Sequence, residues 1–322
     1  REERSVDYWG ALTLVLAIVP MLLAFVWAGK DYPWLSPQII GMLLFSAVTL
    51  GVFAMVEKKS AEPIIPLSLF RNSIFSVSVL VVFLSGMGMF GTIMFIPLFV
   101  QGVIGTSATN SGMILTPMML SMICGSVVGG QLLSRTGKYR LVGLGGLLTI
   151  VFGAYLLTLM DVHATNGVAV RNMIITGLGL GVTMPLYVIV VQNAFDHDKM
   201  GIVTSSIQFF RSIGGTVGVA IMGTFMSNRM MAEIKAQLPP QLLALFSPER
   251  LAQLEDPQAL LDPGALEKLR QQMPPGTAGL LDQLLTAMKE SLALSIHDVF
   301  VVGVFVTLLA VVIHLFLKEI PL

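Results

Sequence analysis

Certain polar side chains lie within or near long apolar segments of this sequence. They are Gln101, Thr183, Tyr187, Gln192, Asn193, Gln208 and Arg211. An amide or guanidinium group is costly to bury in hydrocarbon unless it is paired or reached by water. Each of these side chains is therefore a candidate for contact with a ligand or with water inside the molecule. Several lie near the ends of their segments, where interfacial water explains them equally well.

A second concentration of chemically active residues is the stretch GGQLLSRTGKYR, residues 129–140. It places Arg135, Lys138 and Arg140 between two apolar runs, in a chain of which only 12% is charged. Cations clustered in this way anchor the orientation of neighbouring segments in a membrane. Anchoring alone is one sufficient interpretation of the stretch.

Constellations that catalyse reactions are absent from the sequence. It holds no HExxH pair, no G-x-S-x-G elbow, no paired carboxylates within an apolar segment and no phosphate-binding G-x-x-x-x-G-K-[ST]. The run GLGLG at 177–181 lacks the G-x-G-x-x-G spacing, and the single cysteine, Cys124, has no Cys or His at ligand spacing. We therefore expect no enzyme, no metal site and no cofactor. His314 lies inside an apolar segment, where relaying protons and packing against a helix are both open roles.

The elements that must position these residues are membrane-spanning helices. Hydrophobic residues make up 55% of the 322 residues and the mean hydropathy is +0.83. A hydrocarbon core of about 30 Å requires roughly 20 apolar residues in helical form, because each segment must satisfy its own backbone hydrogen bonds. The predicted spans are about 8–29, 37–56, 74–104, 111–133, 141–160, 168–193, 205–228 and 296–317. The fold class is therefore an all-α integral membrane protein with eight transmembrane helices.

The distribution of basic residues predicts the orientation of these spans. One side carries Arg1, Arg4, Lys58, Lys59, Arg71, Arg135, Lys138, Arg140, Lys199, Arg211 and Lys318, and the other side carries Lys30 and Arg171 in its short loops. Because basic loops stay on the cytoplasmic side, both termini of this chain are predicted to be cytoplasmic.

Residues 229–295 form a long segment on the opposite, outer side, and its charge says little about orientation. Prolines interrupt it, while QALLDPGALEKLRQQM and GLLDQLLTAMKESLAL have apolar residues at helical spacing. We expect short amphipathic helices there, on or near the outer membrane surface. A lid over a substrate and a solvated helical hairpin both remain open.

Small residues recur within the spans at spacings that let helices approach closely. The residues assigned to helix packing are Gly125, Gly129, Gly177, Gly179, Gly181, Pro185, Gly214, Gly215 and Gly218. Spans that pack closely and move past one another, with polar groups reached by water, are typical of a transporter. The hypothesis at this point is a membrane transporter.

The stretch at 129–140 resembles the cytoplasmic loop motif of the major facilitator superfamily, G-x-L-x-D-R-x-G-R-[RK]. Gly130, Arg135, Gly137 and Lys138 are in register, and Ser134 stands where the strongest form has Asp. This variant is similar to the second copy of the motif in the fourteen-span drug:proton antiporters, the EmrB/QacA subgroup. Further resemblances are VDYWGALTL at the start, AEPIIPLSLFRNSIF at 61–75, FIPLFVQGVIGTSATNSGMILTP at 95–117, GLGLGVTMPLYVIVVQNAF at 177–195 and SSIQFFRSIGGTVGVAIMGT at 205–224.

The resemblance implies that the chain is the C-terminal part of such a transporter. Residues 1–58 then form two linker helices, 59–228 the first five helices of the C-terminal six-helix bundle, 229–295 the long extracytoplasmic loop, and 296–322 the last helix and a short cytoplasmic tail. The implied function is proton-driven efflux of lipophilic or cationic compounds by alternating access, with the proton gradient as the energy source. The implied partners are the lipid bilayer, the substrates and a missing N-terminal six-helix half. The acids that couple transport to protons are expected in that half, so this chain alone is expected not to transport.

The same resemblance gives the basic stretch a second interpretation. Arg135, Lys138 and Arg140 would contact carboxylates or helix C-termini when the cytoplasmic side is closed, and so act as a gate. Arg211, with Gln208 one turn earlier, is a similar candidate. A non-transporting scaffold or receptor that uses the 229–295 segment is the alternative function. A periplasmic adaptor stays open, and no nucleic-acid partner is expected.

Overall fold

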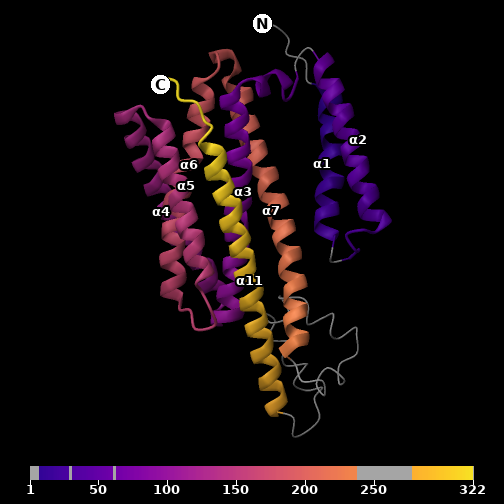
Figure 1. Ribbon diagram of the computed structural model, residues 1–322, viewed down its shortest axis with the longest axis vertical. Coiled ribbons are helices and arrows are strands. Elements are labelled where there is room, and N and C mark those ends of the chain that lie inside the picture. The colour runs from indigo at the N-terminus through magenta and orange to yellow at the C-terminus, as the bar shows by residue number, and fades with distance from the viewer. Residues whose placement is uncertain (1–6, 29–30, 61–62, 238–277, 322) are drawn as a thin grey trace.

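The computed structural model describes residues 7–28, 31–60, 63–237 and 278–321, and these residues form helices without a β-sheet (Figure 1). Eight of the helices are long and apolar enough to cross a membrane, which confirms the predicted class. The helices are α1 (Tyr8–Trp27), α2 (Pro37–Lys59), η1 (Leu67–Arg71), α3 (Ser73–Phe99), η2 (Val100–Ile104), α4 (Ala108–Thr136), α5 (Tyr139–Thr158), α6 (Asn166–Asn193), η3 (His197–Lys199), α7 (Met200–Gln237) and α11 (Ala278–His314).

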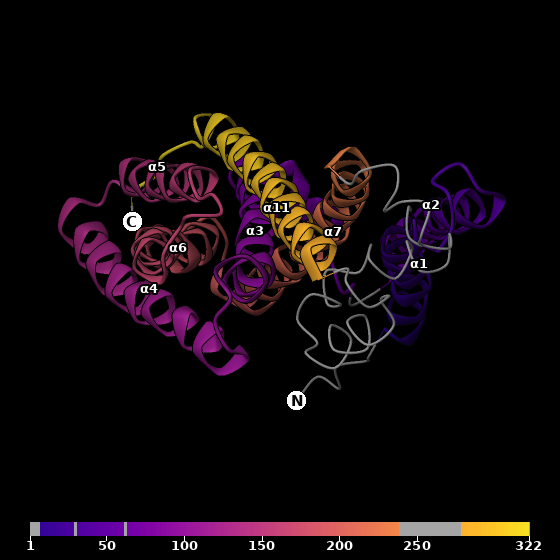
Figure 2. The ribbon, with the colours of Figure 1, turned by 90° about the horizontal axis from the view of Figure 1, so that it is seen from below.

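Six of these helices pack into one bundle. Helix α4 lies against α6, α6 against α5, and α3 against α7, while α11 packs on α3, α5 and α7. Viewed along the bundle, α5 and α11 cover one side of the row formed by α4, α6, α3 and α7 (Figure 2). The other side of that row has no helix over it in the described chain.

Helices α1 and α2 pack on each other and form a separate pair beside α7 (Figure 1). The contact with the bundle includes a hydrogen bond of 3.1 Å from the Thr224 hydroxyl to the carbonyl of Ala28. Most of the surface of the pair is exposed and apolar, including Leu44, Phe45 and Val48. Such a surface suits contact with lipid.

Helices α3 and α6 form the centre of the bundle. Within their most apolar stretches 67% and 56% of the residues are buried, compared with 28% in α4. A helix that is buried on most sides is apolar on all of them. The sequences of α3 and α6 are accordingly almost continuous hydrophobic runs.

The ends of the helices follow local rules. The carboxylate of Asp7 accepts a hydrogen bond of 2.7 Å from the amide of Gly10, and the side chain of Asn72 accepts one of 2.9 Å from Ile74. Such caps satisfy backbone amides that have no partner inside the helix. At the other end of α4, Gly137 has φ of 64° and donates its amide to the carbonyl of Leu133 at 2.8 Å. Glycine adopts this left-handed conformation without steric cost, so the helix ends there.

The boundaries of the 229–295 segment differ from the prediction. Helix α7 continues to Gln237 and α11 begins at Ala278, so residues 229–237 and 278–295 belong to the two long helices. The expected amphipathic helix GLLDQLLTAMKESLAL is thus the first half of α11. The predicted helix QALLDPGALEKLRQQM, at 258–273, lies outside the described residues.

The apolar face of this stretch explains the difference, because it is buried against α7 and not at a membrane surface. Leu284, Met288 and Leu292 of α11 join Met230 and Ile234 of α7 in the hydrophobic core. An ion pair of 3.2 Å between Arg229 and Asp298 also joins the two helices. Periodicity alone does not distinguish a helix that lies on a membrane from one that pairs with a neighbour.

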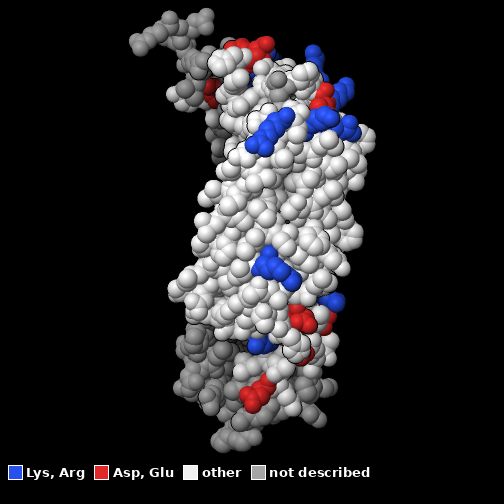
Figure 3. All heavy atoms as spheres, turned by 90° about the vertical axis from the view of Figure 1, so that its left-hand side faces the viewer, with Lys and Arg blue, Asp and Glu red and all other residues white. Residues whose placement is uncertain are grey.

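Charged side chains are unevenly placed along the bundle. In the face shown in Figure 3, Lys and Arg gather at one end, and most of the belt beneath them is uncharged. The end that carries Lys138, Arg140 and Lys318 is called the basic end below.

Candidate functional site

Arg211 of α7 is a buried cation with neutral partners. Its side chain is only 6% exposed, and its guanidinium donates to the side-chain oxygen of Gln208 and, at 3.1 Å, to the carbonyl of Met184 in α6. Within the described chain no Asp or Glu forms an ion pair with it. Burying a guanidinium without an anion costs free energy, and this cost is typical of functional positions in membrane proteins.

A small cavity lies beside Arg211 between α3, α6 and α7. The volume that the centre of a water molecule can occupy in it is about 10 Å³, which is enough for about one water molecule. The polar groups on its wall are Ser85, Thr183, Tyr187 and Arg211. The structure thus brings together three of the predicted polar candidates and adds Ser85, which sequence reasoning did not select.

Tyr187 connects this cavity to the basic end. Its hydroxyl lies 2.7 Å from Nδ1 of His314 in α11, and Nε2 of the same ring lies 2.8 Å from the carbonyl oxygen of Arg140 in α5. Tyr187 and His314 are 1% and 0% exposed. One polar path therefore joins α6, α11 and α5 inside the bundle.

The remaining polar candidates lie elsewhere. Gln101 donates to the hydroxyl of Ser111 at 2.6 Å, where α3 and η2 meet the start of α4. Gln192 donates to Thr204 at 2.8 Å, and Asn193 donates to the carbonyl of Pro321 at 2.9 Å. These three residues tie helix ends together and do not share the cavity beside Arg211.

The three cations of the basic stretch differ in their contacts. Arg135, Lys138 and Arg140 are all exposed, and Gly130 has open space around it. Arg140 donates from Nη2 to the carbonyl of Leu315 at 2.6 Å, just beyond the C-terminus of α11. Arg135 and Lys138 make no side-chain hydrogen bond or ion pair to any described residue.

The tail that follows α11 is held at the same place. The hydroxyl of Tyr139 donates to the carbonyl of Lys318 and accepts a hydrogen bond of 2.7 Å from the amide of Ile320. Together with the hydrogen bonds of Arg140 and Asn193, these contacts hold residues 315–321 against the start of α5 and the end of α6.

The predicted packing glycines lie where helices approach most closely. Between α4 and α6, a methyl group at Gly125, Gly177 or Gly181 would overlap a backbone carbonyl of the facing helix. The other positions are Gly129 against Val182, Gly179 against Gly146 and Ile150 of α5, and Gly214, Gly215 and Gly218 against Phe83, Phe90 and Met87 of α3. Pro185, in the middle of α6, has no amide proton to donate to the carbonyl of Gly181.

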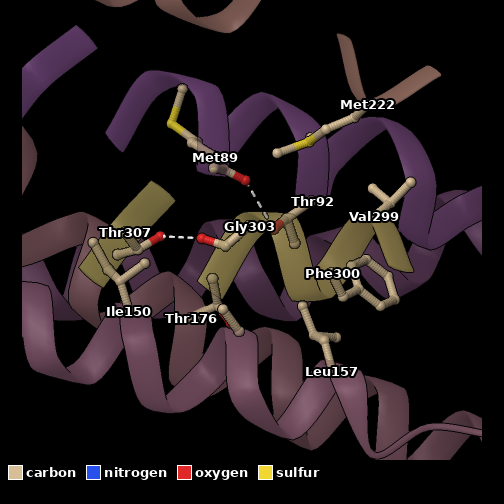
Figure 4. Close-up of a pocket in the computed structure, with 13 residues that line it drawn as sticks. Met89, Thr92, Ile150, Leu157, Thr176, Met222, Val299, Phe300, Gly303 and Thr307 are labelled. Carbon is tan, nitrogen blue, oxygen red and sulfur yellow. Dashed lines mark hydrogen bonds between the residues drawn. The ribbon is translucent and has the colours of Figure 1, made fainter. Parts of the chain in front are cut away.

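A second narrow cavity lies deeper in the bundle, between α3, α5, α6, α7 and α11 (Figure 4). Thr92 and Thr307 line it and donate their hydroxyls to their own helices, at 2.9 and 2.7 Å, while Met89 and Met222 contribute their sulfurs. The volume that the centre of a water molecule can occupy in it is about 10 Å³, so the cavity is too small for an organic substrate in this conformation. Sequence reasoning missed these residues because threonine and methionine are ordinary in apolar helices.

Helix α7 carries a line of exposed polar residues. Ser205, Gln208, Ser212 and Thr216 are exposed at spacings of three or four residues, and so share one face of the helix. By contrast, the exposed residues in the C-terminal part of α11 are apolar, namely Phe305, Leu308, Leu309 and Val312, and Leu315 and Phe316 follow just after the helix. The α11 face suits lipid, whereas the α7 face suits water or another part of a protein.

Comparison with known proteins places the chain in a family. The sequence profile of the Major Facilitator Superfamily matches residues 6–219. The multidrug transporter protein MdtP of Bacillus subtilis is 38% identical over 98% of this chain, and multidrug resistance protein 3 of the same organism is 32% identical over 98%. This chain spans 59% of the length of each of these two relatives.

Two further matches extend the comparison. The tetracycline resistance determinant of Streptomyces rimosus is 30% identical, over 97% of this chain and 91% of its own length. Among solved structures, a bacterial homologue of the human lysosomal transporter Spinster, in an inward-facing and occupied conformation, superposes with a TM-score of 0.54. It is 16% identical, over 94% of this chain and 68% of that chain, and so supports the fold alone. The eight apolar helices, the profile match and the relatives agree, and the chain belongs to the Major Facilitator Superfamily.

Proposed function

We propose that this chain is the C-terminal part of a proton-driven multidrug efflux antiporter of the EmrB/QacA subgroup. It exports lipophilic or cationic compounds by alternating access. In this proposal it lies in the cytoplasmic membrane. Both termini of the chain and the basic end of the bundle face the cytoplasm. The names of its relatives, two for multidrug transport or resistance and one for tetracycline resistance, support the class of substrate.

The observation that carries the proposal is the contrast between the two faces of the bundle. In the C-terminal part of α11, from residue 305 onward, the exposed residues are apolar, while the exposed stripe of α7 consists of Ser205, Gln208, Ser212 and Thr216. Ser205 and Thr216 donate their hydroxyls to carbonyls of their own helix, but in contact with lipid the Ser212 hydroxyl and the amide nitrogen of Gln208 would have no partner among the described residues. In this proposal the stripe faces the translocation pathway, and a further six-helix half forms the opposite wall.

The chemistry of the proposed wall suits varied substrates. Met94 of α3 and Met113 and Met119 of α4 are exposed at 60%, 64% and 58%. Methionine is flexible and polarizable, and it adapts to ligands of different shapes. Among the described residues of the bundle, only Arg211 is a buried Lys, Arg, Asp or Glu, and its neutral partners leave it free to respond to an anion.

Proton coupling requires buried acids, and the described part of this chain places none inside its six-helix bundle. Of the described Asp and Glu residues only Glu57 is buried, at the end of α2, where it accepts hydrogen bonds from the amides of Ile64 and Ile65. It therefore has a structural partner and lies outside the six-helix bundle. The coupling acids are proposed to lie in the six-helix half, so the 322-residue chain alone does not transport.

Dye efflux tests this proposal. Cells that carry the complete gene should export a lipophilic cationic fluorescent dye, a protonophore should abolish export, and vesicles that contain only the 322-residue chain should show none. Export that survives the protonophore would refute proton coupling. No export by the complete protein, when it is present at normal levels in the membrane, would refute the transport function and favour a scaffold.

A further inference from the structure

The direction of each hydrogen bond around His314 follows from the chemistry of its partners. The carbonyl oxygen of Arg140 can only accept, so Nε2 of His314, 2.8 Å away, carries a proton. A neutral imidazole then has its lone pair on Nδ1, which lies 2.7 Å from the hydroxyl of Tyr187. The Tyr187 hydroxyl must therefore donate its proton to His314. Toward the cavity beside it, the Tyr187 oxygen can then only accept a hydrogen bond.

The other hydroxyl groups of that cavity are also restricted to accepting. Ser85 donates to the carbonyl of Val81 at 2.7 Å, and Thr183 donates to carbonyls of its own helix at 3.1 and 3.2 Å. With His314 neutral, the cavity is thus lined by three residues whose hydroxyls can only accept further hydrogen bonds, and by Arg211. One water molecule that accepts from Arg211 and donates to two hydroxyls satisfies this arrangement.

Protonation of His314 changes one bond and preserves the other. Nε2–H still donates to Arg140, but Nδ1 becomes a donor toward Tyr187. The Tyr187 hydroxyl must then accept from His314, and its own proton turns toward the cavity. His314 is also the last residue of α11, where the helix dipole favours a positive charge.

We propose that His314 is a positioning residue that sets the hydrogen-bond direction of Tyr187, and so transmits protonation at the basic end to the cavity beside Arg211. Neutral His314 makes Tyr187 an acceptor for the cavity, and the imidazolium makes it a donor. The contact itself is a property of this chain, and only its effect on transport rests on the proposed function. No carboxylate is needed for this link.

The charged and titratable groups around His314 come from each element that packs there. They are Tyr139 and Arg140 at the start of α5, Tyr187 of α6, Lys318 and Glu319 of the tail, and Arg211 of α7 across the cavity. None of these groups places a carboxylate in a hydrogen bond with the ring. Tyr187 is thus the titratable partner that must respond when His314 gains a proton.

Gly143 of α5 provides a sharp structural test of the contact. A methyl group at Gly143 would lie 2.7 Å from Cε1 of His314 and 3.2 Å from Leu186, so alanine there displaces the imidazole. Gly145, two residues later in the same helix, has no atom within 4 Å of such a methyl group. Gly143→Ala and Gly145→Ala are therefore a matched pair of variants.

Nuclear magnetic resonance of the 322-residue chain in lipid nanodiscs, labelled at His and Tyr, measures the link directly. The chain has only four histidines and five tyrosines, and the His314→Asn and Tyr187→Phe spectra identify the two signals. The expected result is the Nε2–H form at high pH and a shift of the Tyr187 Cζ signal when the imidazolium forms. Gly143→Ala should abolish that shift, and Gly145→Ala should keep it.

Three results would overturn the proposal: an Nδ1–H tautomer, a Tyr187 signal that ignores the charge of His314, or a His314 that stays neutral down to about pH 4. Efflux by the complete protein then tests the consequence. The wild type should show a histidine-dependent step in its pH profile that His314→Asn removes. If the Tyr187 signal follows the charge of His314 but the complete protein shows no efflux, the transport function alone is refuted. Efflux with an unchanged pH profile in His314→Asn would refute the effect of the link on transport.

Discussion

Gly125 of α4 lies against the peptide group of Leu178 in α6, so that a methyl group at Gly125 would overlap the Leu178 carbonyl. Backbone atoms cannot rotate away as a side chain does, so the two helices must separate to accommodate any larger residue. The glycine therefore sets the distance between α4 and α6.

Gly125→Ala should lower the free energy of unfolding by about 1–3 kcal/mol, because overpacking forces the helices apart. Gly130→Ala, on the same helix in open space, should instead be neutral or stabilise by up to about 1 kcal/mol, because alanine favours helix. Thermal unfolding in detergent measures both variants. Equal midpoints for the two would contradict the close approach of α4 and α6.

Arg211→Met should separate stability from function. Because the guanidinium is buried against neutral partners, its loss also removes a desolvation cost, and the free energy of unfolding should stay within about 1 kcal/mol of wild type. Dye efflux by the complete protein should fall at least about tenfold, a loss of about 1.4 kcal/mol in transition-state or binding free energy. A stable variant with normal efflux would remove Arg211 from the site.

The cations of the basic stretch should differ in their effects on stability. Arg140→Gln loses the hydrogen bond to the Leu315 carbonyl and should cost about 1 kcal/mol, whereas Arg135→Gln should leave the unfolding midpoint unchanged. Arg135→Glu in the complete protein then tests gating separately. Normal efflux at normal expression and orientation would leave Arg135 with an anchoring role only.

Tyr139→Phe should release the C-terminal tail. The variant loses the hydrogen bonds to the Lys318 carbonyl and from the Ile320 amide. At about 1 kcal/mol each, hydrogen exchange of the tail should accelerate about fivefold to thirtyfold in mass spectrometry. Tyr155→Phe, at an exposed tyrosine of the same helix, is the control and should exchange as the wild type does.

Cysteine labelling should distinguish the two exposed faces. In a Cys124→Ser background of the complete protein, Ser205→Cys, Ser212→Cys and Thr216→Cys should react with a membrane-impermeant thiol reagent in at least one transport conformation. Leu308→Cys and Val312→Cys on α11 should not react. Equal labelling of both sets would refute a water-filled pathway along α7.

Much of the fold follows from the sequence, because the length of an apolar run and the length of a spanning helix are both set by the thickness of the hydrocarbon core. The eight spans agree with the helices to within a few residues, except at the C-terminal end of α7 and the N-terminal end of α11. There the apolar stripe of residues 278–295 packs against a partner 50 residues away in the chain, and a helical period contains no information about such a partner.

The candidate site was only half predictable. Thr183, Tyr187 and Arg211 could be selected because polar groups are conspicuous in an apolar segment. Ser85 and His314 complete their surroundings from α3 and α11, and only the three-dimensional packing shows that these residues meet. Gln101, Gln192 and Asn193 met the same criterion, but their side chains connect helix ends. A sequence does not show reliably how far along its helix, and so how deep in the bundle, a side chain lies.

The paired extensions of α7 and α11 act as a lever. An α-helix of 38 residues is about 57 Å long, nearly twice the thickness of a hydrocarbon core of about 30 Å. Because Met230 and Ile234 of α7 pack with Leu284 and Met288 of α11, the two extensions move together. Tilting the bundle by a few degrees therefore moves their ends by several ångströms. A spectroscopic label near Gln237 would therefore register a rocking motion that is almost invisible at the pivot.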